Sequence, residues 1–216
     1  MAQSRKILLL GAGGHCMSVL DSLIALDQYT DIAIIDKSNN TSNILGIPVI
    51  GVDDDLERLY EEGYSDAFIT VGSLGDTSIR RKLYKKLKDI GYNIPNIIDN
   101  SSIISDFTTI GEGNYIGKNT VINVGASIGN CTIINTSSTI EHECTINDFV
   151  HISPGSILCG NVTIEADTHI GAASVIRQGL SIGSNTIIGL GSVVVSNINS
   201  NTMAYGNPCK EVKYEL

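Results

Sequence analysis

The sequence contains no tryptophan, and aromatic residues make up only 5% of its 216 positions. It has no apolar run close to the ~20 residues that a helix needs to cross a bilayer, so we expect no membrane span. Basic residues are scarce, since 14 Lys and Arg are set against 23 Asp and Glu and leave a net charge of -9. This acidic balance argues against nucleic-acid binding through a broadly basic surface.

Cysteine is also sparse. The five cysteines are odd in number and include no close pair, which argues against a disulfide framework and favours a reducing compartment. Residues 1–10 carry two basic side chains before a short apolar run, and a glycine-rich turn follows at once, so we expect no signal peptide. These features together predict a cytoplasmic protein.

Isoleucine and glycine are abundant instead. Isoleucine outnumbers leucine by 33 to 16, and there are 22 glycines. β-Branched side chains fit the pleated surface of a sheet, and glycine is frequent in turns. The composition therefore predicts a chain rich in strands and turns, and its length predicts one or two compact domains.

Up to about residue 96, strand-like and helix-like segments alternate. The last helical segment is amphipathic, with Ile79, Leu83, Leu87 and Ile90 as its expected apolar face. The β-α-β alternation predicts a small parallel sheet covered by helices, a Rossmann-like arrangement. The predicted strands are residues 6–10, 32–35 and 67–71, and the predicted helices are residues 16–26, 53–62 and 77–90.

From residue 98 onward, an aliphatic residue recurs at every sixth position. The repeat runs through 17 hexads without a slip, and a small or β-branched residue usually stands four positions after the aliphatic one. A helix cannot hold a strict period of six, and a plain strand would show a period of two. The repeat predicts a parallel β-helix, which packs one aliphatic side chain per short strand into a narrow central column. The aliphatic positions are Ile98, Ile104, Ile110, Ile116, Ile122, Ile128, Ile134, Ile140, Ile146, Ile152, Leu158, Ile164, Ile170, Ile176, Ile182, Ile188 and Val194.

This pattern resembles the hexapeptide-repeat acyltransferases. The resemblance implies a left-handed β-helix with three hexads per coil, and 17 hexads then make between five and six coils. Near the end, Gly206-Asn207-Pro208-Cys209-Lys210 is similar to the G-x-P-x-K tail that closes many members. We therefore expect an α/β domain at residues 1–96, an all-β left-handed β-helix at residues 97–201 and a closing tail at residues 202–216.

A histidine lies between two carboxylates in Glu141-His142-Glu143. A neighbouring carboxylate would raise the basicity of the imidazole and set its tautomer, which suits a general base. A surface histidine in an acidic turn fits the same spacing, so the residues alone leave both interpretations open. Residues 135–144 resemble the catalytic segment of bacterial nucleotide-sugar N-acetyltransferases, in the family that also contains the sialic acid O-acetyltransferases. The resemblance implies that His142 is the base, that Glu143 tunes it and that Asn135 positions the substrate.

Four further residues are assigned by the same resemblance. His151 precedes a repeat isoleucine, so its side chain should face outward at a coil edge; contact with acetyl-CoA is implied, and a solvated or intersubunit histidine is the alternative. Gly160 is either a tight corner or a residue whose N–H holds the thioester oxygen as negative charge develops. Ala172 and Leu190 stand at coil corners, where family members bind the pantetheine and nucleotide of CoA.

A glycine-rich turn, Gly11-Ala12-Gly13-Gly14-His15, joins the first strand to the first helix. Helix N-termini after such turns bind phosphates, but the dinucleotide fingerprint needs glycine where Cys16 stands, which weakens an NAD interpretation. A plain strand-to-helix turn fits as well. The loops after the later strands also follow carboxyl ends, where open α/β sheets bind ligands. In the similar enzymes these loops hold a UDP-sugar, which implies as its binding residues Gly13, Gly14, His15, Asp36, Lys37 and Gly72.

Other side chains have simpler explanations. The spacing of Cys131, Cys144 and Cys159 is unlike that of zinc ligands, so no metal is expected. Cys144 takes the small-residue position of its hexad and is expected to pack in the core. His169 has no partner pattern and is interpreted as a surface residue, and the lysines of residues 85–88 as the solvated face of a helix.

The resemblance covers nearly the whole chain. It implies an acetyl-CoA-dependent N-acetyltransferase acting on a nucleotide-linked amino sugar, expected to be a UDP-4-amino-4,6-dideoxy sugar, in a homotrimer with sites between adjacent prisms. Direct transfer is expected because no Cys or Ser is placed as a covalent nucleophile. Four alternatives stay open: a sialic-acid-type O-acetyltransferase, an N-acetyltransferase for a GDP-linked amino sugar, a non-catalytic scaffold, and an NAD-linked first domain.

Overall fold

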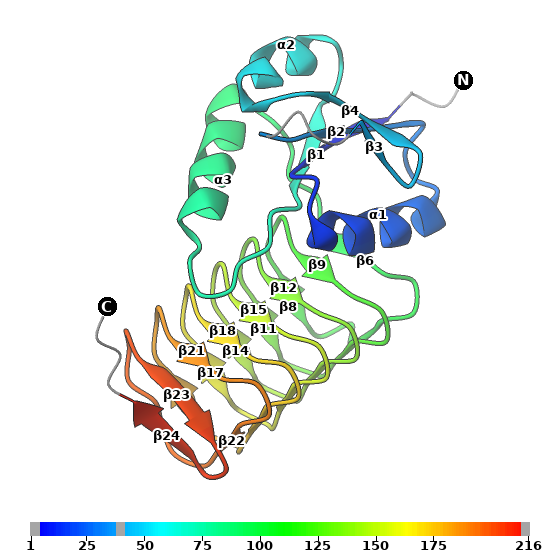
Figure 1. The fold of residues 1–216 in the computed structure, drawn as a ribbon. Coiled ribbons are helices and arrows are strands. Elements are labelled where there is room, and N and C mark those ends of the chain that lie inside the picture. The colour runs from blue at the N-terminus through cyan, green and yellow to red at the C-terminus, as the bar shows by residue number, and fades with distance from the viewer. Residues whose placement is uncertain (1–4, 38–41, 213–216) are drawn as a thin grey trace. The chain divides into compact units, whose positions relative to one another are not determined.

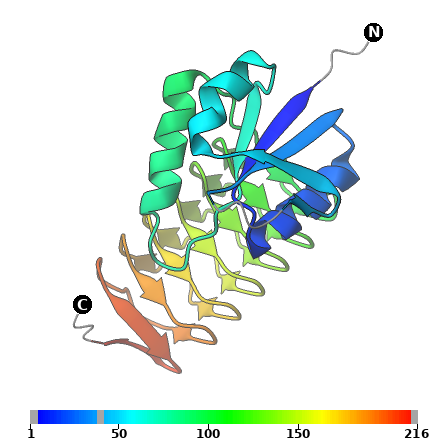
Figure 2. The same ribbon diagram turned by 45° about the horizontal axis from the view of Figure 1, so that its top comes forward.

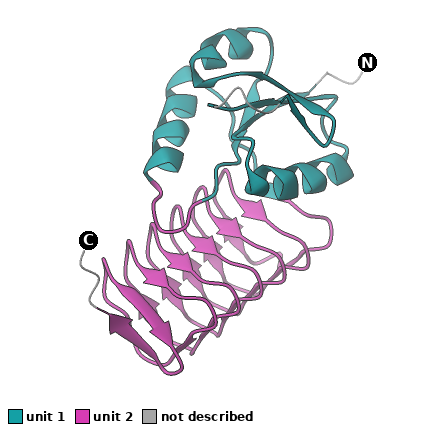
Figure 3. Cartoon of the chain, viewed as in Figure 1, with its two compact units in different colours: residues 1–72, 78–97 teal, residues 73–77, 98–216 magenta. Residues whose placement is uncertain are grey.

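The computed structural model describes residues 5–37 and 42–212. The chain divides into two compact units (Figure 3). Unit 1 contains residues 1–72 and 78–97, and unit 2 contains residues 73–77 and 98–216. The short segment 73–77 therefore belongs to the second unit, although the chain on both sides of it belongs to the first.

Unit 1 is a five-stranded sheet covered by helices, as the alternating pattern predicts. The strand order is β3-β4-β2-β1-β5, and every neighbouring pair is parallel except β3 and β4. Figures 1 and 2 show α1 on the opposite face of the sheet from α2 and α3. In chain order the elements are β1 (Lys6–Leu10), α1 (Gly14–Leu26), β2 (Asp31–Ile35), β3 (Asn43–Ile44), β4 (Ile47–Gly51), the 3-10 helix η1 (Asp53–Asp55), α2 (Leu56–Glu61), β5 (Asp66–Ile69) and α3 (Ser78–Ile90).

One prediction for α3 is wrong. Ile79, expected on the apolar face, is 58% exposed, whereas the neighbouring Arg80 is buried. The guanidinium of Arg80 donates hydrogen bonds to the carbonyl oxygens of Ile69 (3.2 Å) and Val71 (2.5 Å) at the end of β5. Because these carbonyls satisfy the charged group, the helix turns Arg80 inward and leaves Ile79 outside.

Unit 2 is a left-handed β-helix with three faces, each a sheet of short strands stacked coil upon coil. Strands on one face pair in parallel with a register of 18 residues, for example Ile133 with His151 and His151 with His169. Face one is the sheet β24-β23-β21-β18-β15-β12-β9-β6, face two is β22-β19-β16-β13-β10-β7, and face three is β20-β17-β14-β11-β8. The strands are β6 (Ile97–Ile98), β7 (Ile103–Ile104), β8 (Thr109–Ile110), β9 (Tyr115–Ile116), β10 (Val121–Ile122), β11 (Ser127–Ile128), β12 (Ile133–Ile134), β13 (Thr139–Ile140), β14 (Thr145–Ile146), β15 (His151–Ile152), β16 (Ile157–Leu158), β17 (Thr163–Ile164), β18 (His169–Ile170), β19 (Val175–Ile176), β20 (Ser181–Ile182), β21 (Ile187–Ile188), β22 (Val193–Val194), β23 (Met203–Gly206) and β24 (Cys209–Val212).

The repeat aliphatics form the central column, as predicted. Each one from Ile116 to Val194 is at most 3% exposed, while Ile98, Ile104 and Ile110 in the first coil are partly buried. One side chain per strand fills a prism this narrow, which leaves no room for an indole. At the other end, Ala204 and Cys209 of the β23–β24 hairpin are buried in the same column and close it.

The corners of the prism also repeat every six residues. From Gly113 to Gly191, the residue three positions after each repeat aliphatic has a positive φ, whichever amino acid it is. Two of the three rows of corners matter for the site. The first corner, between faces one and two, contains residues 117–120, 135–138, 153–156, 171–174 and 189–192; the second corner, between faces two and three, contains residues 123–126, 141–144, 159–162 and 177–180.

Candidate active site

His142 and Glu143 lie in the second corner, in the turn between β13 and β14. The imidazole Nδ1 is 3.1 Å from Glu143 Oε2, and the two side chains are 55% and 71% exposed. An ionised carboxylate only accepts hydrogen bonds, so this contact places the proton of a neutral imidazole on Nδ1. Nε2 is then the unprotonated nitrogen, which is the form that a general base needs.

Gly160 lies in the same corner, one coil after His142. A Cβ built on Gly160 would overlap the imidazole at Cε1 and Nε2, so only glycine leaves room for the ring in this position. The Gly160 carbonyl accepts a hydrogen bond from Gly179 N (3.0 Å), but within the part of the chain that the structure describes its own N–H donates none. An unused backbone donor therefore lies beside the basic nitrogen.

The other carboxylate of the motif has a different partner. Glu141 Oε2 accepts a hydrogen bond of 2.9 Å from Asn123 Nδ2 in the preceding coil. The structure thus separates the two glutamates that flank His142: Glu143 contacts the imidazole, and Glu141 joins two coils.

Cys144 packs in the core, as predicted. It is fully buried, and its thiol donates a hydrogen bond to the carbonyl of Cys159 (3.2 Å). Burial raises the pKa of this thiol, which keeps it protonated. Cys144 therefore lacks both the exposure and the thiolate that a nucleophile requires.

Two of the residues expected to bind acetyl-CoA, together with the expected substrate-positioning residue, lie at a different place from His142. Asn135, Ala172 and Leu190 all lie in the first corner, and Ala172 and Leu190 hold the same position in consecutive coils. Leu190 is 81% exposed, and the Ala172 carbonyl accepts a hydrogen bond from Gly191 N (2.8 Å). The coils approach closely here, because a Cβ at Gly171 would come within 2.5 Å of Leu190 N.

His151 lies near this corner but is not at an open coil edge. It is the first residue of β15, on the outside of face one, and its side chain is partly buried. Its Nδ1 is 2.8 Å from the carbonyl oxygen of Ser73, and its Nε2 is 3.5 Å from Asn135 Nδ2. The sequence analysis gives Ser73 no role; the two glycines of the loop after β5, Gly72 and Gly75, are the signal that this segment is irregular.

The prediction that His169 is a surface residue is wrong. Its imidazole packs edge-on against that of His151, with ring centroids 4.9 Å apart and an interplanar angle of 82°. His169 Nε2 lies 3.4 Å from Ser153 Oγ, and burial lowers the pKa of the imidazole. The 18-residue register of face one stacks the two histidines, and no pattern within one hexad shows this.

Within one chain, the predicted catalytic residues are therefore in the second corner, whereas Asn135, Ala172 and Leu190 are in the first. Strand β13 separates them, because the chain runs from Asn135 through β13 (Thr139–Ile140) to His142. The two corners are the opposite edges of face two. A site that uses both sets of residues therefore needs a first corner and a second corner that lie side by side.

In unit 1, the predicted nucleotide-sugar residues lie in the loops that follow β1, β2 and β5, neighbours in the sheet. Gly13 and Gly14 begin α1 and are exposed, and a Cβ at either would meet no atom within 4 Å. Gly72 is also exposed, and a Cβ there would lie 3.7 Å from the Cβ of His15. The helix start thus offers open backbone N–H groups of the kind that bind phosphate.

Two contacts shape this edge of the sheet. Asp36 Oδ2 accepts a hydrogen bond of 2.6 Å from Ala12 N, which ties the loop after β2 to the glycine turn. Gly11 has a φ of +109°, and a Cβ there would lie 2.8 Å from Val71 Cγ2, so the tight turn needs glycine. Lys37, beside Asp36, is exposed.

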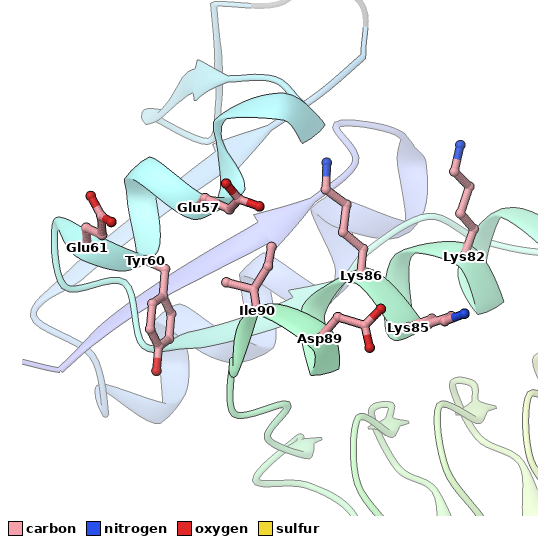
Figure 4. A pocket seen from close by; sticks show the side chains of 8 residues that line it. All are labelled: Glu57, Tyr60, Glu61, Lys82, Lys85, Lys86, Asp89 and Ile90. Carbon is pink, nitrogen blue, oxygen red and sulfur yellow. The ribbon is translucent and has the colours of Figure 1, made fainter.

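A cavity of about 590 Å³ lies between α2 and α3 of unit 1 (Figure 4). None of the predicted site residues lines it. Lys86 on its wall donates to the carbonyl of Asp53 (2.6 Å), so the lysine cluster is not wholly a solvated face. The lining residues are Glu57, Tyr60, Glu61, Lys82, Lys85, Lys86, Asp89 and Ile90.

Two kinds of feature are absent from residues 5–37 and 42–212. These ranges contain no helix with the length and apolarity to cross a membrane. They also contain no cluster of three or more His, Cys, Asp or Glu side chains arranged to hold a metal ion.

Comparison with known proteins adds three structural relatives and one domain match. Residues 6–87 match the family described as the PglD N-terminal domain. A variant of perosamine N-acetyltransferase from Caulobacter crescentus, crystallised with CoA and GDP-perosamine, is 32% identical with a TM-score of 0.91 over 99% of each chain. The acetyltransferase domain of PglB from Neisseria gonorrhoeae is 32% identical, with a TM-score of 0.91 over 97% of this chain and 100% of that one. WeeI from Acinetobacter baumannii, at 24% identity and a TM-score of 0.84 over 97% of this chain and 100% of that one, shares the fold.

The first two relatives match this chain almost from end to end above 30% identity. Both combine an α/β unit and a left-handed β-helix, the architecture described above. The chain belongs to the hexapeptide-repeat family of nucleotide-amino-sugar N-acetyltransferases.

Proposed function

We propose that this protein transfers the acetyl group of acetyl-CoA directly to the amine of a nucleotide-linked amino sugar, with His142 as the general base. One observation carries the proposal: the imidazole of His142, oriented by Glu143, lies against Gly160, whose N–H donates no hydrogen bond to any described residue. A base and an oxyanion donor at one point are the two groups that acyl transfer to an amine requires.

The transfer proceeds through a tetrahedral intermediate. The sugar amine attacks the thioester carbonyl carbon while His142 Nε2 takes a proton from the nitrogen. The Gly160 N–H donates to the oxygen on which negative charge develops. Collapse re-forms the carbonyl, breaks the C–S bond and releases CoA, whose sulfur takes the proton from His142. Glu143 keeps the Nδ1 proton in place and stabilises the imidazolium between the two steps.

Direct transfer is supported by the state of the nearby thiol. A two-step mechanism needs a reactive thiolate or an activated hydroxyl. Cys144, the cysteine nearest to His142 in the sequence, is buried and protonated, and burial raises its pKa. Cys144 is therefore unsuited to be a covalent nucleophile, which supports direct attack by the amine of the acceptor.

The first corner is the proposed acetyl-CoA site, with Ala172 and Leu190 along the arm and His151 of the adjoining strand β15 near the acetyl end. Asn135 in the same corner positions the substrate. The loops after β1, β2 and β5 are the proposed nucleotide-sugar site. There the N–H groups of Gly13, Gly14 and His15 meet the phosphates, and Asp36, Lys37 and Gly72 complete the pocket.

A homotrimer is proposed because face two is apolar and its two edges are the two corners. The outward residues of face three are all Ser or Thr, whereas those of face two are aliphatic at five of six positions, with Ile103 68% and Ile157 40% exposed. Three copies that turn face two toward a common axis would bury this stripe. Each first corner would then meet the second corner of the next copy, which joins the acetyl-CoA residues to His142.

Two acceptors are candidates. The family resemblance favours a UDP-4-amino-4,6-dideoxy sugar, and the match to an enzyme crystallised with GDP-perosamine favours a GDP-linked amino sugar. The deciding experiment is a thiol-release assay with acetyl-CoA and a panel of UDP- and GDP-amino sugars, with matched sugars that carry hydroxyl in place of amine and with free sialic acid. Turnover of one amino sugar supports the proposal, turnover of a hydroxyl sugar such as free sialic acid would make the protein an O-acetyltransferase, and no thiol release from any member would refute it.

A further inference from the structure

Residues Ser73–Thr77, here called the strap, lie against face one of the β-helix. The strap is coloured with unit 2 in Figure 3. Three contacts hold it: His151 Nδ1 with Ser73 O (2.8 Å), Gly75 packed on Ile187, and the Thr77 hydroxyl donating to Asp167. Ser73 and Thr77 are both buried, so the two ends of the strap are part of the packed structure.

The strap fixes the tautomer of His151. A carbonyl oxygen can only accept a hydrogen bond, so the 2.8 Å contact requires a proton on His151 Nδ1. The neutral ring then has an acceptor at Nε2. The orientation of Asn135 is consistent with this tautomer. Its Oδ1 accepts a hydrogen bond from Thr136 N (2.8 Å), so its Nδ2 donor faces His151 Nε2 at a longer distance of 3.5 Å.

His169 supports the other side of the same ring. Its Nδ1 is buried and, among the described residues, has no hydrogen-bond partner, while its Nε2 faces Ser153 Oγ at 3.4 Å. A buried N–H without an acceptor is costly, so the proton belongs on Nε2, where the hydroxyl accepts it. Burial lowers the pKa of His169, which keeps this ring neutral at pH 7. His151 therefore has a neutral, oriented aromatic neighbour 4.9 Å away.

We infer that His169 is a positioning residue: it packs against His151 and, together with the strap, holds that ring in the Nδ1–H tautomer with Nε2 presented to acetyl-CoA. The inference rests on the proposed role of His151 as an acetyl-CoA-binding residue. Without His169, the ring can rotate, and water can reach it and compete for Nδ1.

This arrangement limits what His151 can bind. Because Nε2 is an acceptor, its partner on acetyl-CoA has to be a donor. The acetyl thioester has no donor, whereas the pantetheine arm has two amide N–H groups and a hydroxyl. His151 thus holds the arm by one of these donors, and it does not polarise the thioester carbonyl.

The test combines a spectrum of the unliganded protein with kinetics. In long-range ¹H–¹⁵N spectra of the ¹⁵N-histidine protein at pH 7, assigned with a His151→Gln variant, we expect His151 to be neutral with its proton on Nδ1. His169→Ala is expected to reduce that tautomer and to raise KM for acetyl-CoA about 3- to 10-fold, with kcat within about twofold. His169→Phe keeps a neutral ring and is expected to preserve both readouts.

The outcomes separate the inference from the proposed function. A His151 proton on Nε2 in the wild-type protein, or an unchanged tautomer in His169→Ala, would overturn the positioning role whatever the enzyme acts on. A changed tautomer with an unchanged KM would overturn presentation to acetyl-CoA and would leave the amino-sugar assay as the test of the activity. Thermal unfolding of each variant identifies a folding defect, and if His169→Ala fails to fold, the wild-type spectrum still tests the tautomer of His151.

Discussion

The imidazole of His142 occupies the space that a side chain at Gly160 would fill, one coil further along the β-helix. The 18-residue coil places the two residues in register, and the absence of a Cβ at Gly160 leaves room for the ring. Within the described part of the chain, the N–H of the same glycine donates no hydrogen bond, so one position offers room for the proposed base and a donor for the proposed oxyanion.

Replacing His142 by alanine is expected to lower kcat by about 10²- to 10⁴-fold, the range for loss of a general base. Because the side chain is more than half exposed, Tm should change little. Steady-state kinetics with the best acceptor of the panel, beside a thermal melt, provide the measurement. If kcat stayed within a few-fold of the wild-type value, His142 would not be the base.

Gly160→Ala is expected to displace the imidazole and lower kcat by roughly 10- to 10³-fold, because a small misplacement of a catalytic group is costly. Gly179→Asn is the matched control. Gly179 lies in the same corner with a φ of +71°, a Cβ there meets nothing within 4 Å, and asparagine tolerates this conformation. Equal losses of kcat in the two variants would show that the corner, and not the overlap with His142, is responsible.

Ile157→Lys is expected to dissociate the proposed trimer, because it places a charge in the apolar stripe of face two. Activity should fall with the trimer, since the acetyl-CoA corner and the His142 corner would then separate. Light scattering coupled to gel filtration measures the mass. Thr145→Lys, on the polar outer side of face three, should leave the mass unchanged; a wild-type protein that ran as a monomer would refute the proposed assembly.

Ile164→Ala is expected to lower the free energy of unfolding by about 2–5 kcal/mol, because Ile164 is fully buried in the central column and its truncation leaves a cavity. Its neighbour Thr163 points outward on face three, so Thr163→Ala should change the stability by no more than about 0.5 kcal/mol. Urea unfolding measures both. Similar losses for the two variants would contradict the assignment of inward and outward positions.

The periodic parts of this protein could be predicted from its sequence. A strict six-residue period admits one side chain per short strand, so it specifies the column from Ile98 to Val194 and excludes helices. The alternation before residue 96 likewise predicts the parallel sheet, because strand and helix periods are local properties of the backbone. The motif around His142 could be recognised because its residues are adjacent in the chain.

The contacts that orient the site could not be predicted in this way. Ser73 and His151 are 78 residues apart, and His169 reaches His151 only through the coil register. A linear pattern shows which positions face outward but not which segment returns to cover them, so His169 was assigned to the surface. The exposed Ile79 and buried Arg80 have the same cause, because carbonyls at the end of β5 decide which side of α3 is inside. Periodicity is a property of neighbouring residues, whereas burial and hydrogen-bond partners depend on which distant segments the folded chain brings together.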